Sequence, residues 1–413
     1  MTDVNQAAAM LFNPFSPEFR ADPYPLYAKL REAGAVVKTP FGSHMITRYE
    51  QVDRVLRSQA FRTPRGYKDA NDPSGPPRFD PAGPLSLHRR HWLIFQSGDT
   101  HTRLRKLIMK VFTPRAVRAL SPRIDGLVSE LLAPIVERGS MEVIADLAYP
   151  LPATVICELL GVPAADRDRN RHWGAIVATT IDPLVSDAQI KAAEAAMAEW
   201  DPYIRALLAE RRKQPGDALL DAMLAVEEDG TSFTEDEIAA NATFLFLAGH
   251  ETTTNLIGNG LYALLRHPDQ LAKLRAGREN AAVLENAIEE LLRFESPIQF
   301  APRVPLENVE LEGVTLKQEV PILIALGAAN RDSRRYDRAE ELDVERSDPK
   351  PLSFGGGAHY CVGAALARLE AKHAFEQLFA RTRSITLVTE QPRWKASLTL
   401  RALDELRVEL QPG

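Results

Sequence analysis

The stretch Phe354-Gly355-Gly356-Gly357-Ala358-His359-Tyr360-Cys361-Val362-Gly363 decides the fold. Three successive glycines disfavour a helix or strand interior, because each costs backbone entropy and packs no side chain. Helix-forming residues 364–370 follow, so Cys361 is predicted at or just before a helix N-terminus, where unpaired N–H groups and the helix dipole favour a thiolate. Gly363 leaves room above the sulfur, and Phe354 is placed to shield it from water. The stretch predicts a sheltered, metal-ligating thiolate.

A lone cysteine in such a turn is more often an inert core residue, as we expect for Cys157 in its apolar helix end. The spacing Phe-x-x-Gly-x-x-x-Cys-x-Gly is long and specific, however, and all four defined residues are present. In this stretch the sequence resembles the cytochrome P-450 family, specifically its soluble bacterial members, and the resemblance covers nearly the full length. It implies heme b as cofactor and Cys361 as the proximal iron ligand, with Phe354 and Gly363 beside the cofactor.

The resemblance also implies the fold class: mainly α with small β-sheets, in one triangular domain spanning residues 1–413. The heme would lie between a long distal helix and the cysteine-ligand helix. Length alone is compatible with two or three domains, but no Gly/Ser linker or charge block divides the chain. We therefore expect one domain.

Composition excludes several classes of protein. The chain has 413 residues, 45% of them hydrophobic and 26% charged, which is typical of a globular protein. A net charge of -6 leaves no general basic surface for nucleic acid. No apolar stretch is long enough for a membrane anchor, and the start of the chain lacks a signal-peptide pattern. Two cysteines are too few for a disulfide framework and suit a reducing compartment. A cytoplasmic protein is therefore expected.

Hydrophobic periodicity predicts most of the secondary structure. Two short strands at 36–38 and 43–47 form a hairpin, residues 63–84 are an irregular loop, and residues 331–351 are also irregular. Val309-Glu310-Leu311 and Val314-Thr315-Leu316 flank Glu312-Gly313 as a second hairpin. Helices are predicted over residues 116–138, 190–212, 234–266 and 284–294, the third of them opened by a Thr234–Glu237 capping box.

The helix over residues 234–266 contains Ala248-Gly249-His250-Glu251-Thr252-Thr253-Thr254, where a glycine and three β-branched residues lower helix propensity. Such local misfits tend to mark function, and a glycine there allows the helix to bulge. The pattern Ala-Gly-x-Glu-Thr resembles the family's oxygen-binding groove. It implies that Ala248 and Gly249 lie against the heme, that Thr252 hydrogen-bonds the bound dioxygen, and that Glu251 relays protons. A packed helix is the alternative, whereas a zinc protease is excluded because the second histidine would fall at Thr254.

Two further sets of residues match the family. Glu290 and Arg293 lie at i, i+3 on one predicted helix face, and Arg346 follows in the irregular stretch, which implies a structural network behind the cysteine loop. Heme propionates need cationic or hydrogen-bonding partners when buried. The matching positions are His101, Arg105, Arg303 and His359. Taken singly, each is more often an ordinary surface residue.

The resemblance places mostly apolar residues in the substrate pocket, which predicts a hydrophobic small-molecule substrate. A mobile cover over residues 63–95 is expected above the pocket. Each position could equally be generic core. The pocket residues are Phe244, Leu247, Ala248, Ile298, Gln299, Ala301 and Leu398.

No flavin or iron–sulfur segment is recognised, so electrons are expected from a separate ferredoxin- or flavodoxin-type donor. Arg103, Lys106, Lys110 and Arg115 could form a local basic patch that docks it. The favoured function is insertion of one oxygen atom from dioxygen by hydroxylation or epoxidation. Two alternatives are peroxide-driven oxidation on the same fold, which does not need the Glu251–Thr252 pair, and a non-enzymatic heme sensor.

Overall fold

The computed structural model describes residues 12–64, 79–228, 230–278 and 280–413. Its internal contacts divide the chain into two compact units. Unit 1 comprises Met1–Arg62, Arg123–Leu151 and Thr252–Gly413, and unit 2 comprises Thr63–Pro122 and Pro152–Glu251. The single domain expected from the sequence stays a prediction.

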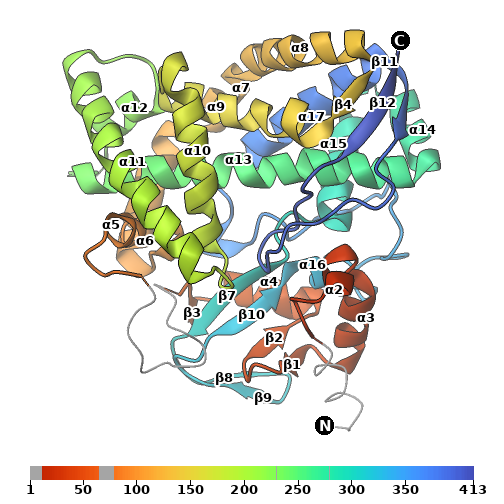
Figure 1. The fold of residues 1–413 in the computed structure, drawn as a ribbon. Coiled ribbons are helices and arrows are strands. Elements are labelled where there is room, and N and C mark those ends of the chain that lie inside the picture. Colours follow the sequence, from red (N-terminus) through yellow and green to blue (C-terminus); the bar gives the residue numbers. More distant parts are fainter. Residues whose placement is uncertain (1–11, 65–78, 229, 279) are drawn as a thin grey trace. The chain divides into compact units, whose positions relative to one another are not determined.

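Five strands form the main sheet of unit 1, in the order β1-β2-β10-β7-β3 (Figure 1). Only the β2–β10 pair is parallel. The β1–β2 hairpin was predicted, and the structure confirms it with a slightly shorter second strand. The strand bounds are β1 Val36–Lys38, β2 His44–Ile46, β10 Ile322–Ala325, β7 Phe300–Pro305 and β3 Phe61–Arg62.

Buried apolar clusters cover both faces of this sheet at its central strands β2 and β10. Ile46 and Ile324 point to one face, where they pack with Val52 of α4 (Tyr49–Arg57). Met45 points to the other face and packs with Tyr27 of α3 (Tyr24–Ala33). The alternation follows from the two-residue period of a strand.

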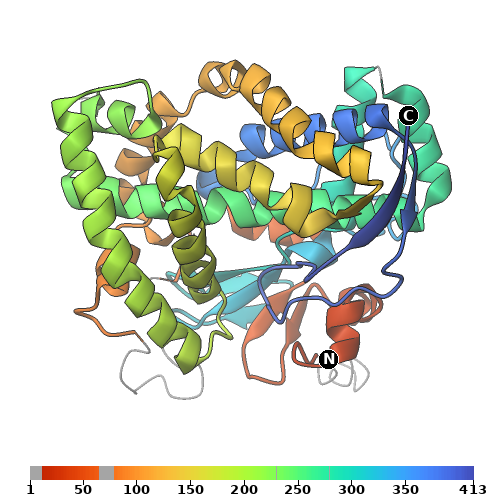
Figure 2. The same cartoon turned by 45° about the horizontal axis from the view of Figure 1, so that its top comes forward.

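Three smaller sheets complete the β-structure. The predicted hairpin β8 (Val309–Leu311) and β9 (Val314–Leu316) is confirmed, with Glu312 and Gly313 both at positive φ in the turn. In unit 1, β12 (Arg407–Pro412) pairs with its neighbours β11 and β4, as Figure 2 shows for the β11–β12 pair. The remaining bounds are β11 Thr382–Leu387, β4 Ser140–Glu142, and, in unit 2, β5 Glu227–Glu228 and β6 Thr231–Ser232.

The other helices of unit 1 include the predicted helix at 284–294, which begins earlier because the Asn280 side chain caps the Ala282 N–H at 3.1 Å. No helix or strand forms over residues 331–351, as predicted. The helices are α2 Pro17–Ala21, α14 Pro268–Gly277, α15 Ala281–Phe294, α16 Leu326–Ala329, α17 Ala364–Arg381, a π-turn Ile144–Ala148 and a 3-10 turn Gly357–His359.

Unit 2 is mainly helical. The predicted helix at 190–212 is confirmed as α11. The one predicted at 116–138 is two helices, α7 and α8, with a break at Leu120, because Pro122 has no N–H to donate to the Arg118 carbonyl. The helices are α5 Pro84–Arg89, α6 Gly98–Val111, α7 Pro114–Ala119, α10 Arg167–Ala178, α11 Asp187–Lys213 and α12 Leu219–Ala225, with 3-10 turns Leu93–Phe95, Ala164–Asp166 and Thr179–Ile181. Helix α8 Ser121–Arg138 begins in unit 2 and belongs mainly to unit 1, and α9 Pro150–Leu160 begins in unit 1 and belongs mainly to unit 2.

Helix α13 (Glu235–Arg266) runs along the chain from unit 2 into unit 1. Its predicted capping box is present, since the Thr234 N–H donates to Glu237 Oε2 at 2.9 Å and the Glu237 N–H donates to Thr234 Oγ1 at 3.2 Å. The helix is uninterrupted through Gly249, so the glycine does not produce a bulge here. None of the helices in the described ranges combines the length and apolar character that a membrane span requires.

Candidate active site

The cysteine loop of unit 1 presents Cys361 immediately before helix α17. The Cys361 N–H donates to the Phe354 carbonyl at 3.0 Å, which closes the loop, and Gly363 is the N-cap of the helix. The Cys361 side chain is exposed and not in a disulfide. The structure therefore places the thiol at the positive end of an 18-residue helix, where a thiolate is favoured.

Gly357 and Gly363 of this loop each leave space for a different neighbour. Gly357 has φ +61°, and a Cβ there would lie 2.6 Å from the Leu56 carbonyl oxygen, so only glycine fits against the end of α4. A Cβ on Gly363 would meet only the Cys361 sulfur, at 3.9 Å. The first glycine docks the loop on its support, and the second keeps the space beside the sulfur open.

A buried network of charges supports the loop. Glu290 accepts from Arg293 Nε at 2.7 Å and from Arg346 Nε at 3.0 Å, both on Oε2. Glu290 and Arg293 are fully buried, and the remaining Arg293 nitrogens donate to three backbone carbonyls, those of Asn330, Ala339 and Glu341. The structure thus brings the three predicted structural residues together, and the network ties the irregular stretch 330–346 to α15.

Asn330 and Ser353 extend this support to the cysteine loop, and sequence reasoning missed both. Asn330 Oδ1 accepts from the Leu352 N–H at 2.7 Å, and its Nδ2 donates to Ser353 Oγ at 2.9 Å. Ser353 Oγ in turn donates to the Leu292 carbonyl of α15 at 2.7 Å. Because Ser353 directly precedes Phe354, these bonds fix where the loop begins. The only signal in the sequence was an asparagine that directly follows the apolar run 320–329.

The middle of α13 differs from the rest of that helix. Residues 239–247 and 253–260 are buried, whereas Ala248, Gly249, Glu251 and Thr252 are each partly exposed. His250 is buried, with Nδ1 donating to the Phe246 carbonyl at 2.7 Å, and its Nε2 lies 3.6 Å from Glu251 Oε2. A partly exposed acid and alcohol are thus adjacent on an otherwise buried helix, while Gly249 packs against Ile156.

The predicted propionate partners differ in their surroundings. In unit 2, His101 and Arg105 both lie on α6, and burial, together with the charge of Arg105, lowers the pKa of His101. In unit 1, His359 ends the 3-10 turn beside Cys361. Arg303 lies on β7 with 7% of its surface exposed, and its Nη1 donates only to the Pro302 carbonyl. Burial lowers the pKa of Arg303 to about 10, and no described acidic side chain forms an ion pair with it.

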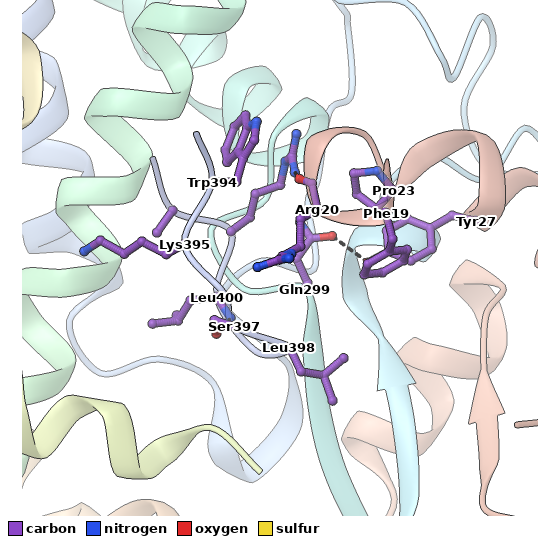
Figure 3. Close-up of a pocket in the computed structure, with 12 residues that line it drawn as sticks. Phe19, Arg20, Pro23, Tyr27, Gln299, Trp394, Lys395, Ser397, Leu398 and Leu400 are labelled. Atoms are coloured by element: carbon purple, nitrogen blue, oxygen red, sulfur yellow. Dashed lines mark hydrogen bonds between the residues drawn. The ribbon is translucent and has the colours of Figure 1, made fainter. Parts of the chain in front are cut away.

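Predicted pocket residues occur in both units. Gln299 and Leu398 line a small pocket of unit 1 together with residues of α2 and α3, and Tyr27 donates to Gln299 Oε1 at 2.9 Å (Figure 3). Ile298 forms a β-bridge to Leu400, and Ala301 pairs with Ile324 in the sheet. In unit 2, Phe244 and Leu247 are buried on α13.

The expected mobile cover over residues 63–95 is partly wrong. Residues 65–78 lie outside the described ranges, but the second half contains α5 and is well anchored. Trp92 stacks on Phe95 and lies 5.6 Å from Phe244, ring centroid to ring centroid. Asn241 of α13 accepts from the Leu93 N–H at 2.9 Å and donates to the His91 carbonyl. Aromatic contacts of this kind could not be deduced from a loop-like composition.

The expected basic patch also needs a correction. Arg103 forms an ion pair with the buried Glu237 carboxylate, so its charge is neutralised within unit 2. Lys106, Lys110 and Arg115 are exposed, although Lys110 donates to the Glu227 carbonyl at 3.1 Å. The other cysteine, Cys157, is fully buried, and burial raises the pKa of its thiol to about 12, as suits the predicted core residue.

A mainly helical chain that presents a cysteine thiol at a helix start, braced by a buried carboxylate–guanidinium network, has the architecture of a heme-thiolate protein. The sequence model of the family described as cytochrome P-450 matches residues 66–397. The chain is 39% identical to the cytochrome P-450 monooxygenase PikC of Streptomyces venezuelae, over 96% of this chain and 93% of PikC. It is also 39% identical to the vitamin D(3) 25-hydroxylase of Pseudonocardia autotrophica, over 96% of each.

A solved structure agrees with these matches. The crystal structure of P-450 BioI in complex with an acyl carrier protein ligated to hexadec-9Z-enoic acid superposes with a TM-score of 0.88 at 34% identity, covering 96% of this chain and 99% of that one. The chain therefore belongs to the cytochrome P-450 family. It has the cytochrome P-450 fold and is an oxidoreductase of the oxygen-incorporating kind. The family implies a heme-thiolate cofactor, a substrate, dioxygen and a redox partner.

The described residues fit such a cofactor. Cys361 offers a thiol at a helix start, and Arg303 is a buried cation without a described carboxylate, which suits a propionate. No cluster of three or more His, Cys, Asp or Glu side chains in the described ranges could hold a metal ion by itself. A thiol and a buried guanidinium are groups that a heme-thiolate cofactor would use, the first for the iron and the second for a propionate.

Proposed function

We propose that this chain is a heme b monooxygenase that inserts one oxygen atom from dioxygen into a hydrophobic organic substrate, by hydroxylation or epoxidation. The proposal depends chiefly on one observation: the Cys361 thiol is exposed, directly before α17, in a loop fixed by the Glu290 network. A bound heme would supply the iron at which dioxygen is activated, with electron donation from the thiolate. Arg303, His359, His101 and Arg105 would hold the propionates, and Phe354 and Gly363 would border the sulfur.

The ligand assignment is tested by the absorption spectrum of the reduced, carbon-monoxide-bound protein. We expect a thiolate-type band in the wild type and in Cys157→Ser, because Cys157 is a buried thiol. Cys361→Ser should lose that band. The total amount of bound porphyrin is measured separately in each variant. A thiolate-type band that survives in Cys361→Ser would refute the proposal.

Glu251 and Thr252 are proposed to deliver the protons that splitting dioxygen consumes. Both are partly exposed at the middle of α13, and Glu251 lies beside the His250 ring. The Thr252 hydroxyl would hold a proton at the reacting oxygen, and the Glu251 carboxyl would resupply it. Peroxide-driven oxidation would need neither group.

Thr252→Val tests this pair, with Thr254→Val as control, since Thr254 is 2% exposed. With a surrogate ferredoxin system and a substrate that shifts the heme spectrum, we expect Thr252→Val to consume reductant but release hydrogen peroxide, and product per reductant should fall roughly tenfold or more. Thr254→Val should remain coupled. Equal coupling in both variants, with undiminished peroxide-driven turnover, would favour the peroxide mechanism instead.

A hydrophobic substrate is supported by the apolar character of Phe244, Leu247 and Leu398. The names of similar proteins point the same way, since one is a hydroxylase of vitamin D(3) and another is bound to a fatty acyl carrier protein. Titration of a library of sterols, fatty acids and macrolides, read as a change in iron spin state, would identify the substrate class. Binding confined to small hydrophilic compounds would contradict it.

We also propose that the electron donor is an acidic ferredoxin or flavodoxin that docks on exposed Lys106, Lys110 and Arg115. Reversing Lys106 and Lys110 to glutamate should slow reduction by such a donor and flatten its salt dependence. Arg118→Glu, at another exposed position, is the control. Unchanged electron-transfer rates in the double variant would contradict this proposed docking surface.

A further inference from the structure

Residues 295–299 connect helix α15 to strand β7, and backbone hydrogen bonds hold the end of this connection on both sides within unit 1. The Gln299 N–H donates to the Thr399 carbonyl at 2.8 Å. The Gln299 carbonyl accepts from the Gly327 N–H of α16 at 3.2 Å. Because Gln299 is the last residue before β7, these bonds fix where the strand begins.

The buried Gln299 side chain adds a connection to helix α3. The Tyr27 hydroxyl donates to Gln299 Oε1 at 2.9 Å (Figure 3), and Gln299 Nε2 donates to the Ser296 carbonyl at 2.7 Å. A carbonyl only accepts, so the second bond identifies which end of the amide is the nitrogen. Burial raises the pKa of Tyr27 well above its usual range, so its hydroxyl keeps the hydrogen that it donates. Gln299 therefore joins α3 to the turn that begins at Ser296.

A glycine of α16 leaves the space in which the Gln299 amide lies. A Cβ on Gly327 would overlap Gln299 Oε1 and would lie 2.8 Å from Cδ. Gly327 is not among the glycines with positive φ, so its backbone conformation suits any residue. Because the amide is the end of a flexible side chain, an alanine at this position would displace Gln299 from Tyr27.

The start of β7 has one side toward α3 and one side away from it. Phe300 is 1% exposed, and its ring meets the Tyr27 ring edge to face, with 5.8 Å between centroids. Ile298 and Ala301 are partly exposed and pack against the apolar cluster on the opposite face of the sheet. Tyr27 thus supports this segment from behind, and the two residues on the other side are among those proposed to contact substrate.

We propose that Tyr27 and Gln299 are positioning residues for substrate selectivity: through their hydrogen bond, α3 fixes the backbone from which Ile298 and Ala301 face the substrate. The inference rests on the proposed function only in assigning Ile298 and Ala301 to the substrate pocket. The Tyr27 hydroxyl acts through Gln299 rather than on the substrate. Loss of the Tyr27–Gln299 bond should therefore weaken the fit of bulky ligands, whereas small ligands of the heme bind as before.

Three variants break this bond in different ways. Tyr27→Phe removes only the hydroxyl, Gln299→Met keeps a side chain of similar length without the amide, and Gly327→Ala displaces the amide. Full-length holoproteins are titrated at neutral pH with pyridine and 4-phenylpyridine, two uncharged probes, and binding is read from the heme spectrum. We expect 4-phenylpyridine to bind each variant roughly threefold to tenfold more weakly than wild type, the effect of one lost hydrogen bond. Pyridine affinity should stay at the wild-type value.

A double variant tests whether the two side chains act through one shared bond. Tyr27→Phe combined with Gln299→Met should weaken 4-phenylpyridine binding no more than the stronger single change, because both remove the same interaction. Fully additive losses would contradict a shared bond.

Tyr336→Phe is the control for lost stability. Tyr336 is also buried, and its hydroxyl donates to the Lys350 carbonyl at 2.9 Å. This variant should lower the melting temperature about as much as Tyr27→Phe but leave both ligand affinities unchanged. A loss of 4-phenylpyridine affinity in Tyr336→Phe equal to that in Tyr27→Phe would overturn the proposal, because destabilisation alone would then explain the effect.

These outcomes separate the positioning role from the proposed function. If pyridine gives no spectral change in wild type, the heme assignment fails. If pyridine binds but 4-phenylpyridine affinity is the same in wild type and in all three single variants, the heme assignment stands and the positioning role of Tyr27 and Gln299 is wrong.

Discussion

At the scale of single residues, the degree of burial distinguishes charged side chains that are essential for stability from those that contribute little. Glu290 is fully buried and bonded to two guanidinium groups, whereas its neighbour Glu289 pairs with the partly exposed Arg368. The two glutamates are adjacent in sequence and belong to the same helix. Only the surroundings differ, so their substitution should have very different costs.

We expect Glu290→Gln to lower the free energy of unfolding by about 3–5 kcal/mol, because Arg293 and Arg346 would be left as buried, poorly compensated cations. Glu289→Gln should cost no more than about 1 kcal/mol. Urea unfolding of the two variants, followed by circular dichroism, gives the comparison. Similar midpoints for both would mean that the buried network does not stabilise the cysteine loop.

The sequence revealed some of these residues and concealed others for physical reasons. Glu290 and Arg293 are visible because helix geometry places i and i+3 together. Arg346 could be suggested only by family resemblance, since no local rule connects it to residues 56 positions earlier. Asn330, Ser353 and the Glu237 partner of Arg103 were missed, because their contacts arise from the tertiary fold.

At the scale of elements, the cysteine loop depends on how closely it approaches α4. Gly357 and Gly42 both have positive φ, but only Gly357 has backbone atoms within 3 Å of an added Cβ, and Gly42 has nothing within 4 Å. Replacing Gly42 by alanine therefore adds only backbone strain, whereas replacing Gly357 adds both backbone strain and a steric clash. Comparing the stabilities of the two variants separates these two energetic costs.

Gly42→Ala should destabilise the protein by about 1–2 kcal/mol, the cost of left-handed backbone for a residue with a Cβ. Gly357→Ala should lose roughly 3 kcal/mol or more and should also reduce heme content, because the loop must retreat from Leu56 and carry Cys361 with it. Thermal unfolding and the ratio of heme absorbance to protein absorbance measure both effects. Normal heme content in Gly357→Ala would contradict the docking role of this glycine.

Elements with strong local signals were predicted well: both hairpins, α11, α15 and the capped start of α13 are confirmed. The weaker predictions failed where packing overrides composition. The second half of residues 63–95 reads as loop but forms α5 and buries Trp92 and Phe95. The parallel pairing of β2 with β10 joins residues nearly 280 positions apart, for which no local pattern exists.

At the scale of the whole molecule, unit 1 holds Cys361, the proposed cofactor ligand, in the loop that the Glu290 network supports. Helix α13 carries the proposed acid–alcohol pair at the position where the chain passes from one unit to the other. The stability of unit 1 is thus a precondition for binding the cofactor. One buried carboxyl of α17 makes that stability sensitive to pH.

Glu370 is fully buried on α17, and among the described residues its Oε2 has no hydrogen-bond partner. Burial raises the pKa of this carboxyl well above its usual value of 4.5, so the folded protein holds a proton that the unfolded chain releases. The stabilising effect of that proton is complete below the unfolded value and is lost as pH rises from there toward the folded value. Stability should therefore decline with pH by up to about 1.4 kcal/mol per pH unit from this group.

Glu370→Gln, which mimics the neutral carboxyl, should remove this contribution. We expect the variant to resemble wild type in acid and to become progressively more stable than wild type as pH rises, in melting temperatures measured by calorimetry across the pH range. Glu376→Gln, at an exposed position of the same helix, should follow the wild-type curve. A constant offset between Glu370→Gln and wild type at every pH would show that Glu370 is ionised in the fold, and its charge would then require a partner from the cofactor side of α17 or from water.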